Sequence, residues 1–123
     1  MLIDKDEARI TLAQTILAVL EWEWLDESLS VEARRVLPIL FLTLYLAEKD
    51  GRHTNKRQAS VVMGVDQAKT GPKYIAQCVG RGFLTVEKRD DKRKDYLRTT
   101  EELRLTIEHN LVELLEHINR RAK

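Results

Sequence analysis

The chain has 123 residues, of which 43% are hydrophobic and 33% charged, as expected for a single globular domain with its own core. Its apolar runs are shorter than the roughly 20 residues of a membrane-spanning helix, and its acidic start, Met1 to Glu7, is unlike a basic signal peptide. One cysteine, Cys78, excludes an intrachain disulfide. We therefore expect a cytoplasmic protein that makes no membrane contact.

The net charge of +1 conceals an uneven distribution along the chain. Residues 49–98 contain thirteen Lys and Arg against six Asp and Glu, whereas residues 1–30 contain two against seven. A cation excess confined to one region is expected of a surface that meets phosphate groups. This distribution favours a nucleic-acid partner for residues 49–98.

Residues 5–25 are predicted to form a helix, because apolar residues recur along them at steps of three and four. The apolar face is wider than one packing partner requires, which favours a subunit interface, although burial inside a monomer remains the alternative. From this helix we expect the interface to include Ile10, Leu17, Leu20 and Trp24.

A polar break from Asp26 to Ser30 precedes a strongly apolar run, Val31 to Lys49, with Ser30 as the candidate N-cap. Pro38 lies inside this run, and proline lacks the amide hydrogen used in a helix interior. Either the helix is kinked there or its regular part begins there. We expect it to begin near Pro38 and to end at Asp50-Gly51.

Two shorter helices are predicted next. Thr54 can cap a helix from Asn55 to about Met63, and Gly64 marks the following turn. In the next helix Gly71-Pro72 leaves two alternatives: an irregular turn over residues 66–70, or a bent helix that begins at Asp66. Inward-facing residues are expected to be Tyr74, Ile75 and Cys78, and outward-facing ones Lys69, Thr70, Lys73 and Gln77.

Gly80-Arg81-Gly82 ends this helix, and two extended runs, Phe83–Lys88 and Asp95–Arg98, flank a charged turn. Helix, strand, charged turn, strand is the order of a winged helix-turn-helix. We therefore predict a mainly α fold with a small two- to three-stranded β wing. In that fold a helix fits the major groove while the ribbon touches the backbone or the adjacent minor groove. An ordinary solvated hairpin is the alternative.

Glu101 to Arg121 is predicted to be a long final helix. Its apolar stripe is expected to complete the dimer interface through Leu103, Ile107, Leu111, Leu114 and Ile118. His109, Glu113 and His117 lie along one face, but the two histidines are two turns apart, too far to share one ion without other ligands. We therefore predict no metal and no cofactor.

From about Pro38 onward the sequence resembles the MarR family of bacterial winged-helix transcription regulators. The resemblance rests on Gly82-Phe83-Leu84, Asp91-Lys92-Arg93, Tyr96-Leu97-Arg98 and Thr99-Thr100-Glu101-Glu102. It implies that Arg93 reaches into the minor groove while Asp91 holds its guanidinium group. It also implies a homodimer built from the N- and C-terminal helices, and a cavity for a small-molecule effector between those helices and the DNA-binding lobe.

These observations predict a single domain in which residues 31–99 bind double-stranded DNA and residues 1–30 and 100–123 dimerise. The alternative is a winged-helix protein-interaction or assembly module, which does not require the local cation excess. An enzyme is disfavoured, since the sequence offers no nucleophile-base pair or glycine-rich phosphate loop. The expected DNA contacts are Lys56, Arg57, Lys69, Thr70, Lys73, Gln77, Arg89, Asp91, Lys92 and Arg93.

Overall fold

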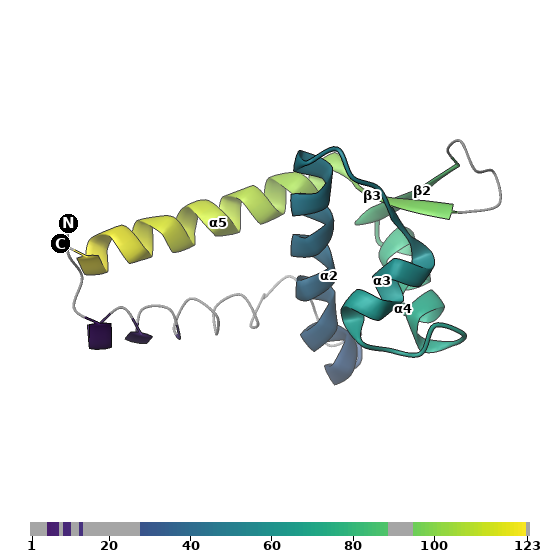
Figure 1. Cartoon of the computed structure of the whole chain (residues 1–123), viewed down its shortest axis with the longest axis horizontal. Coiled ribbons are helices and arrows are strands. Elements are labelled where there is room, and N and C mark those ends of the chain that lie inside the picture. Colours follow the sequence, from purple (N-terminus) through teal and green to yellow (C-terminus); the bar gives the residue numbers. More distant parts are fainter. Residues whose placement is uncertain (1–4, 8, 11–12, 14–27, 89–94, 123) are drawn as a thin grey trace.

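The computed structural model describes residues 5–7, 9–10, 13, 28–88 and 95–122 (Figure 1). The fold is mainly helical with one small antiparallel sheet, as predicted. Of the predicted helix 5–25, the described residues 5–7, 9–10 and 13 are helical. The elements are α2 (Val31–Lys49), β1 (Thr54–Asn55), α3 (Lys56–Met63), α4 (Thr70–Gly80), β2 (Leu84–Lys88), β3 (Asp95–Thr99) and α5 (Glu101–Ala122).

Helix α2 begins at Val31, so the expectation that it begins near Pro38 is wrong. Ser30 is its N-cap, as predicted, and the Ser30 hydroxyl accepts a hydrogen bond from the Ala33 amide at 3.1 Å. Pro38 is buried inside the helix. The turns before it bury Ala33 and Leu37 in the core, which offsets the roughly 3 kcal/mol that an interior proline costs a helix.

Helix α3 is capped by Asn55 and not by Thr54. The Asn55 side chain accepts from the Gln58 amide at 2.8 Å, and the Gln58 side chain accepts from the Asn55 amide at 2.9 Å. This reciprocal capping box satisfies two backbone donors at once. Thr54 instead belongs to β1, opposite Leu97 of β3, so pairing in the sheet places the cap one residue later than predicted.

A turn over residues 66–69 leads into α4, which corresponds to the first of the two predicted alternatives, except that the helix already begins at Thr70, inside the range predicted for the turn. The Gly71 amide donates to the Asp66 carbonyl at 2.8 Å, and Pro72 therefore falls in the first turn of the helix, where a missing amide hydrogen costs little. A Cβ on Gly71 would lie 1.9 Å from the Ser60 Oγ. Gly71 thus permits the close approach of α3 and α4.

The sheet has the order β1-β3-β2, with both pairs antiparallel. β2 and β3 form the predicted hairpin, in which Leu84 lies opposite Thr99 and Lys88 opposite Asp95. The Thr100 hydroxyl donates to the Gly82 carbonyl at 2.7 Å and accepts from the Leu103 amide at 3.1 Å. The wing is therefore tied directly to the start of α5.

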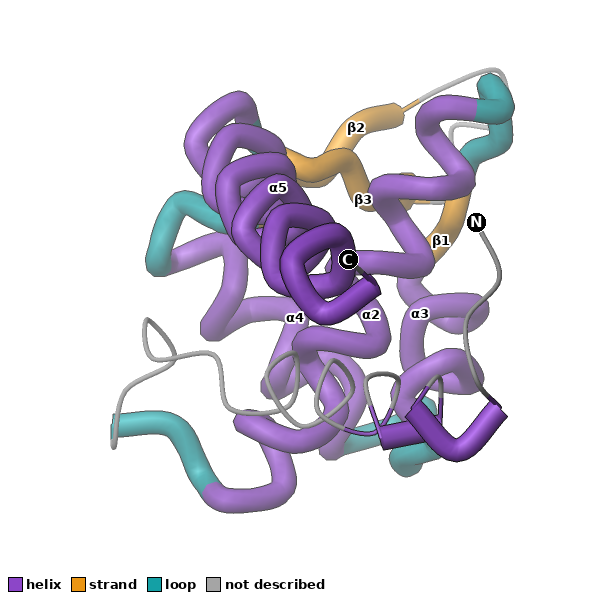
Figure 2. Tube along the Cα trace, turned by 90° about the vertical axis from the view of Figure 1, so that its left-hand side faces the viewer, coloured by secondary structure: helices purple, strands orange, loops and turns teal. Residues whose placement is uncertain are grey.

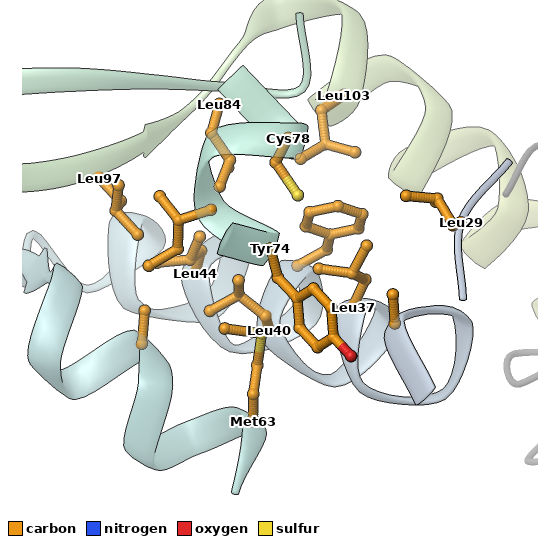
Figure 3. Close-up of a cluster of buried hydrophobic side chains, with 14 of the residues drawn as sticks. Leu29, Leu37, Leu40, Leu44, Met63, Tyr74, Cys78, Leu84, Leu97 and Leu103 are labelled. Atoms are coloured by element: carbon orange, nitrogen blue, oxygen red, sulfur yellow. The ribbon is translucent and has the colours of Figure 1, made fainter. Parts of the chain in front are cut away.

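Figure 3 shows the core where α2, α4, the sheet and α5 meet. Leu40 and Leu44 of α2 lie in it, with Cys78 of α4. Burial raises the pKa of the Cys78 thiol to about 12, so this group is a core residue, as predicted. The other fully buried large side chains include Leu37, Phe41, Ile75, Leu84, Leu103 and Ile107.

Helix α5 starts beside α2 and then extends away from the sheet and from α3 and α4 (Figure 1). Figure 2 looks along α5 toward these elements. Leu103 and Ile107 are buried in the core of the chain itself. Their assignment to a dimer interface is corrected, because a side chain already enclosed by its own subunit presents no surface to a second copy.

Candidate nucleic-acid interface

Helices α3 and α4 pack against each other as a helix-turn-helix beside the wing (Figure 1). The inner face of α4 buries Tyr74, Ile75 and Cys78, as predicted. The opposite face of α4 is therefore held at a fixed position on the surface, where its side chains can meet a ligand.

Lys69 and Lys73 are exposed at the N-terminal end of α4, and Thr70 between them is half-exposed. The two lysines are four residues apart, so they lie on one face of the helix. Lys69 occupies the N-cap position and makes no side-chain capping bond among the described residues. A helix N-terminus carries partial positive charge, so this end of α4 combines two mobile cations with a favourable dipole for phosphate.

Gln77 differs from the expectation that it faces outward. Its side chain is half-buried, and its Oε1 is buried with no hydrogen-bond partner among the described residues. If the side-chain amide is rotated by half a turn, Nε2 takes the buried position of Oε1, so one of the two polar atoms is buried in either orientation. Because recognition of adenine by Gln uses both atoms, Gln77 does not offer that contact in this conformation.

Lys56 joins α3 to the base of the wing. Its Nζ lies 3.2 Å from Asp95 Oδ2, and Lys88 of β2 forms an ion pair with the same carboxylate. The hydrogen bonds from Lys88 and then Lys56 lower the pKa of Asp95. Lys56 is half-buried and partly neutralised, whereas the neighbouring Arg57 is exposed. Arg57 is therefore the better placed of the two for a phosphate.

Four expected contacts on the wing tip, Arg89, Asp91, Lys92 and Arg93, lie outside the described residues. What is described is the ribbon that carries them. Its last register pair is Lys88 opposite Asp95, and Asp95 contacts Lys56, so this end of the described hairpin lies against α3.

Tyr74 connects α4 to the start of α2, a contact that the sequence did not predict. Its hydroxyl donates to Glu32 Oε1 at 2.7 Å and lies 3.3 Å from the Ser30 Oγ. The hydrogen bond with Ser30 lowers the pKa of Tyr74, but burial and the Glu32 carboxylate outweigh it and raise the pKa overall. Tyr74 and Glu32 are 42 residues apart, so no local pattern pairs them.

Glu48 of α2 forms a second unpredicted connection. Its carboxylate accepts from the Thr99 hydroxyl at 2.8 Å and from the Thr99 amide at 3.2 Å, and Arg104 Nη1 lies 3.9 Å away. One carboxylate thus joins α2, β3 and α5. It holds the start of α5 against α2 and the sheet.

The remaining residues of the predicted dimer interface divide into two groups. Ile10 is exposed, while Leu111 and Leu114 are half-buried. Leu17, Leu20, Trp24 and the side chain of Ile118 lie outside the described residues. The large apolar side chains that α5 exposes are instead Leu105 (61%), Val112 (53%) and Leu115 (56%).

His109 and Glu113 form an exposed pair with 3.2 Å between Nε2 and Oε1. Within the described residues, no three His, Cys, Asp or Glu side chains are grouped to hold a metal ion. A search of the same residues finds no helix with the length and apolarity required to cross a membrane.

Neither a protein-family model nor a curated protein matches this sequence. Its three-dimensional structure is similar to solved transcription regulators. Tm0710 from Thermotoga maritima is 22% identical, with a TM-score of 0.59 over 95% of this chain and 78% of that one. The MarR-like regulator Tm0816 from the same organism is 15% identical, with a TM-score of 0.58 over 97% and 83%.

A third match is BpsR from Bordetella bronchiseptica, whose DNA binding is regulated by 6-hydroxynicotinic acid. It is 22% identical, with a TM-score of 0.50 over 94% of this chain and 75% of that one. At these identities the likeness establishes the fold. The chain has the winged-helix fold of MarR-like regulators.

Proposed function

We propose that this chain, which has the winged-helix fold of MarR-like regulators, is a dimeric, sequence-specific DNA-binding transcription regulator. Helix α4 would enter the major groove, and the wing tip between β2 and β3 would meet the minor groove. The observation that carries this proposal is the outer face of α4, where Lys69 and Lys73 are exposed at the helix N-terminus. That surface matches a polyanion in both charge and shape, since a helix about 10–12 Å across fits a groove about 12 Å wide.

The wing and α3 would supply the flanking contacts. Arg57 on α3 is exposed for a backbone phosphate. Arg93, which lies between β2 and β3 in the sequence, would supply the minor-groove contact. The Lys56–Asp95–Lys88 cluster holds the base of the wing against α3. DNA that contacts α4 would therefore meet the wing in a fixed relative position.

A second copy would be bound through the terminal helices. Val112 and Leu115 are exposed on the part of α5 that extends from the core. Leu105 is exposed nearer the start of α5, and Ile10 is exposed on the N-terminal segment. A two-fold axis between two such helices would present two α4 helices to successive major grooves, about 34–36 Å apart.

A small-molecule effector is the remaining partner that the resemblance implies, at a site between the terminal helices and the rest of the subunit. The pocket at the junction of α5 with the lobe is lined by Tyr45, Glu48, Arg98 and Arg104 and encloses about 180 Å³. Ligand sites are usually about 300–1,000 Å³. This hollow is smaller than that range, whereas an open hollow of about 590 Å³ between α2, α3 and the sheet, lined by residues that include His53, Gln58 and Tyr96, falls within it.

The test is fluorescence anisotropy of the purified protein on random-sequence duplex DNA at low and high salt. We expect micromolar binding that weakens steeply with salt, because bound lysines displace counterions. The double variant Lys69→Ala/Lys73→Ala should reduce the slope of log K against log[salt] by about 2.

Arg120→Ala is the matched control, because Arg120 is an exposed cation at the far end of α5. This variant should bind as wild type does. No duplex binding at low salt would instead favour the protein-interaction module.

A further inference from the structure

The outer face of α4 carries few groups that can form hydrogen bonds with bases. Across residues 69–80, all of which the structure describes, the exposed residues are Lys69, Pro72, Lys73, Ala76, Val79 and Gly80. Only the two lysines have polar side chains. Direct readout of adenine or cytosine requires Asn, Gln or a carboxylate, and the exposed face of α4 presents none of them. Guanine can be read by lysine, but Lys69 and Lys73 lie only at the N-terminal end of the face, so they leave the rest of it without a base-reading group.

The apolar residues of this face are arranged in a stripe. Pro72, Ala76 and Val79 are four and three residues apart, so they lie one above another along the helix. Val79 is 40% exposed, although it is β-branched and apolar. Lys69 and Lys73 stand at the N-terminal end of the stripe, where they can reach phosphates while the apolar residues face the floor of the groove.

Gln77 is the one residue of α4 with an amide side chain, and it does not add a base-reading group to the exposed face. Its Oε1 is buried, so the bidentate contact that would read adenine is not formed from this position. Thr70 is half-exposed at the start of the helix, nearly two turns before Ala76, the stripe's second residue. The bases opposite the middle of α4 would therefore face hydrocarbon.

Only one base presents hydrocarbon to the major groove: thymine, through its C5 methyl group. Guanine, cytosine and adenine present donors and acceptors, which an apolar side chain would desolvate without replacing their hydrogen bonds. We propose that α4 recognises thymine methyl groups through Pro72, Ala76 and Val79, with Lys69 and Lys73 held by the flanking phosphates. This inference rests on the proposed function and names the base that its recognition helix reads.

The same stripe is poorly suited to a protein partner. Two of its three residues, Pro72 and Ala76, are small, and lysines border it. A specific protein interface usually buries about 800 Å² on each side and is depleted of lysine. The major groove of DNA offers a narrow row of thymine methyl groups, which matches the small size of the stripe. The phosphates on either side of the groove match the lysines that border the stripe.

The experiment begins with selection of bound sites from a random duplex pool. The selected duplexes are then resynthesised with uracil in place of thymine, which removes the C5 methyl and leaves every base-pairing group unchanged. For each thymine methyl group that packs on the stripe, its removal should raise the dissociation constant roughly fourfold. Circular dichroism of each oligonucleotide verifies that the uracil duplex is formed at the assay temperature.

Two variants assign the effect to α4. Ala76→Ser and Val79→Thr make the stripe polar with little change in volume, and both should bring the thymine-to-uracil ratio toward one while binding to the uracil duplex stays within about twofold. Val31→Thr on α2 makes the same chemical change at another exposed valine, to which no contact is assigned, and should retain the wild-type ratio.

Three results would overturn the inference. Equal affinity for thymine and uracil duplexes would mean that the methyl groups are not read. Duplex binding without enrichment of any sequence would mean that phosphates alone are bound, which leaves the proposed function in place without its sequence specificity. Absence of duplex binding at low salt would remove the proposed function and the inference together.

Discussion

Helices α4 and α5 share one core but differ in how much of their length it anchors. α4 contributes buried residues from Gly71 in its first turn to Cys78 near its end. Among the α5 side chains that the structure describes, only Leu103 and Ile107 are fully buried, and beyond them the helix extends from the core with Val112 exposed. A helix packed along its whole length has a fixed outer face, which suits a groove. A helix whose far half exposes apolar surface suits a second copy of itself.

The largest effect is expected from the buried part of α5. Ile107→Ala should lower the free energy of unfolding by about 2–5 kcal/mol, because it leaves a cavity in the core. Val112→Ala, on the exposed part, should leave the stability of the subunit nearly unchanged and weaken dimerisation. Denaturant titration and analytical ultracentrifugation measure the two effects. Equal destabilisation by both variants would contradict the division of α5 into a buried and an exposed part.

The packing of α4 is tested by Gly71→Ala. The added Cβ would meet the Ser60 side chain, so we expect a loss of about 1–3 kcal/mol in thermal or chemical unfolding. Gly80→Ala is the control, because a Cβ there has no neighbour within 4 Å, and it should be neutral or slightly stabilising. A Gly71→Ala variant as stable as wild type would show that α3 and α4 do not approach so closely.

The fold could be predicted largely because its signals are local. Ser30 as a cap, the turn at Gly64 and the two wing strands each depend on residues within one or two turns. The errors arise where tertiary packing overrides local preference. Burial before Pro38 extends α2, and pairing of Thr54 with β3 moves the cap of α3 to Asn55.

The candidate site was less predictable, because its supports join distant segments. Glu48 and Thr99 are 51 residues apart, and Tyr74 and Glu32 are 42 apart. An apolar stripe does not reveal whether it is enclosed by its own chain, so Leu103 and Ile107 could not be separated from Leu105 by periodicity alone. The exposure of Lys69 and Lys73 could be predicted, because cations that alternate with apolar residues along one short helix are a local pattern.

The proposed DNA contact of the wing is tested by Arg93→Ala. This variant should weaken duplex binding by about 1–3 kcal/mol, because it removes the proposed minor-groove contact. Lys49→Ala serves as its control, since Lys49 is an exposed cation at the end of α2. Anisotropy titrations at one fixed salt concentration compare the two. Unchanged affinity in Arg93→Ala would restrict the DNA contact to the helix-turn-helix.

A smaller effect is expected where α4 meets α2. Tyr74→Phe removes the hydrogen bond to Glu32 while it keeps the buried ring, so stability should fall by about 0.5–1.5 kcal/mol. Because this bond positions α4, DNA affinity should fall as well. Glu32→Gln retains an acceptor and should lie between Tyr74→Phe and wild type. Wild-type stability in Tyr74→Phe would mean that the bond does not hold α4.

The smallest effect is expected from Asp95→Asn at the base of the wing, where the loss of stability should depend on pH. The pKa of Asp95 is lowered by Lys88 and Lys56, so its contribution to stability is present above the ordinary carboxyl pKa and is lost as pH falls through the lowered value. The difference in melting temperature between wild type and Asp95→Asn should therefore disappear in acid. A difference that is constant from neutral to acidic pH would exclude this ion-pair cluster as its source.

Hydrogen–deuterium exchange with and without random-sequence duplex DNA tests the central claim most directly, since it reports each region of the native protein separately. DNA should slow exchange in the turn before α4, residues 66–69, and in the wing strands, residues 84–88 and 95–99. Residues 108–120 of α5 should exchange as they do without DNA. Protection confined to α5, with the turn and the wing unchanged, would contradict the assignment of α4 and the wing as the DNA-binding surface.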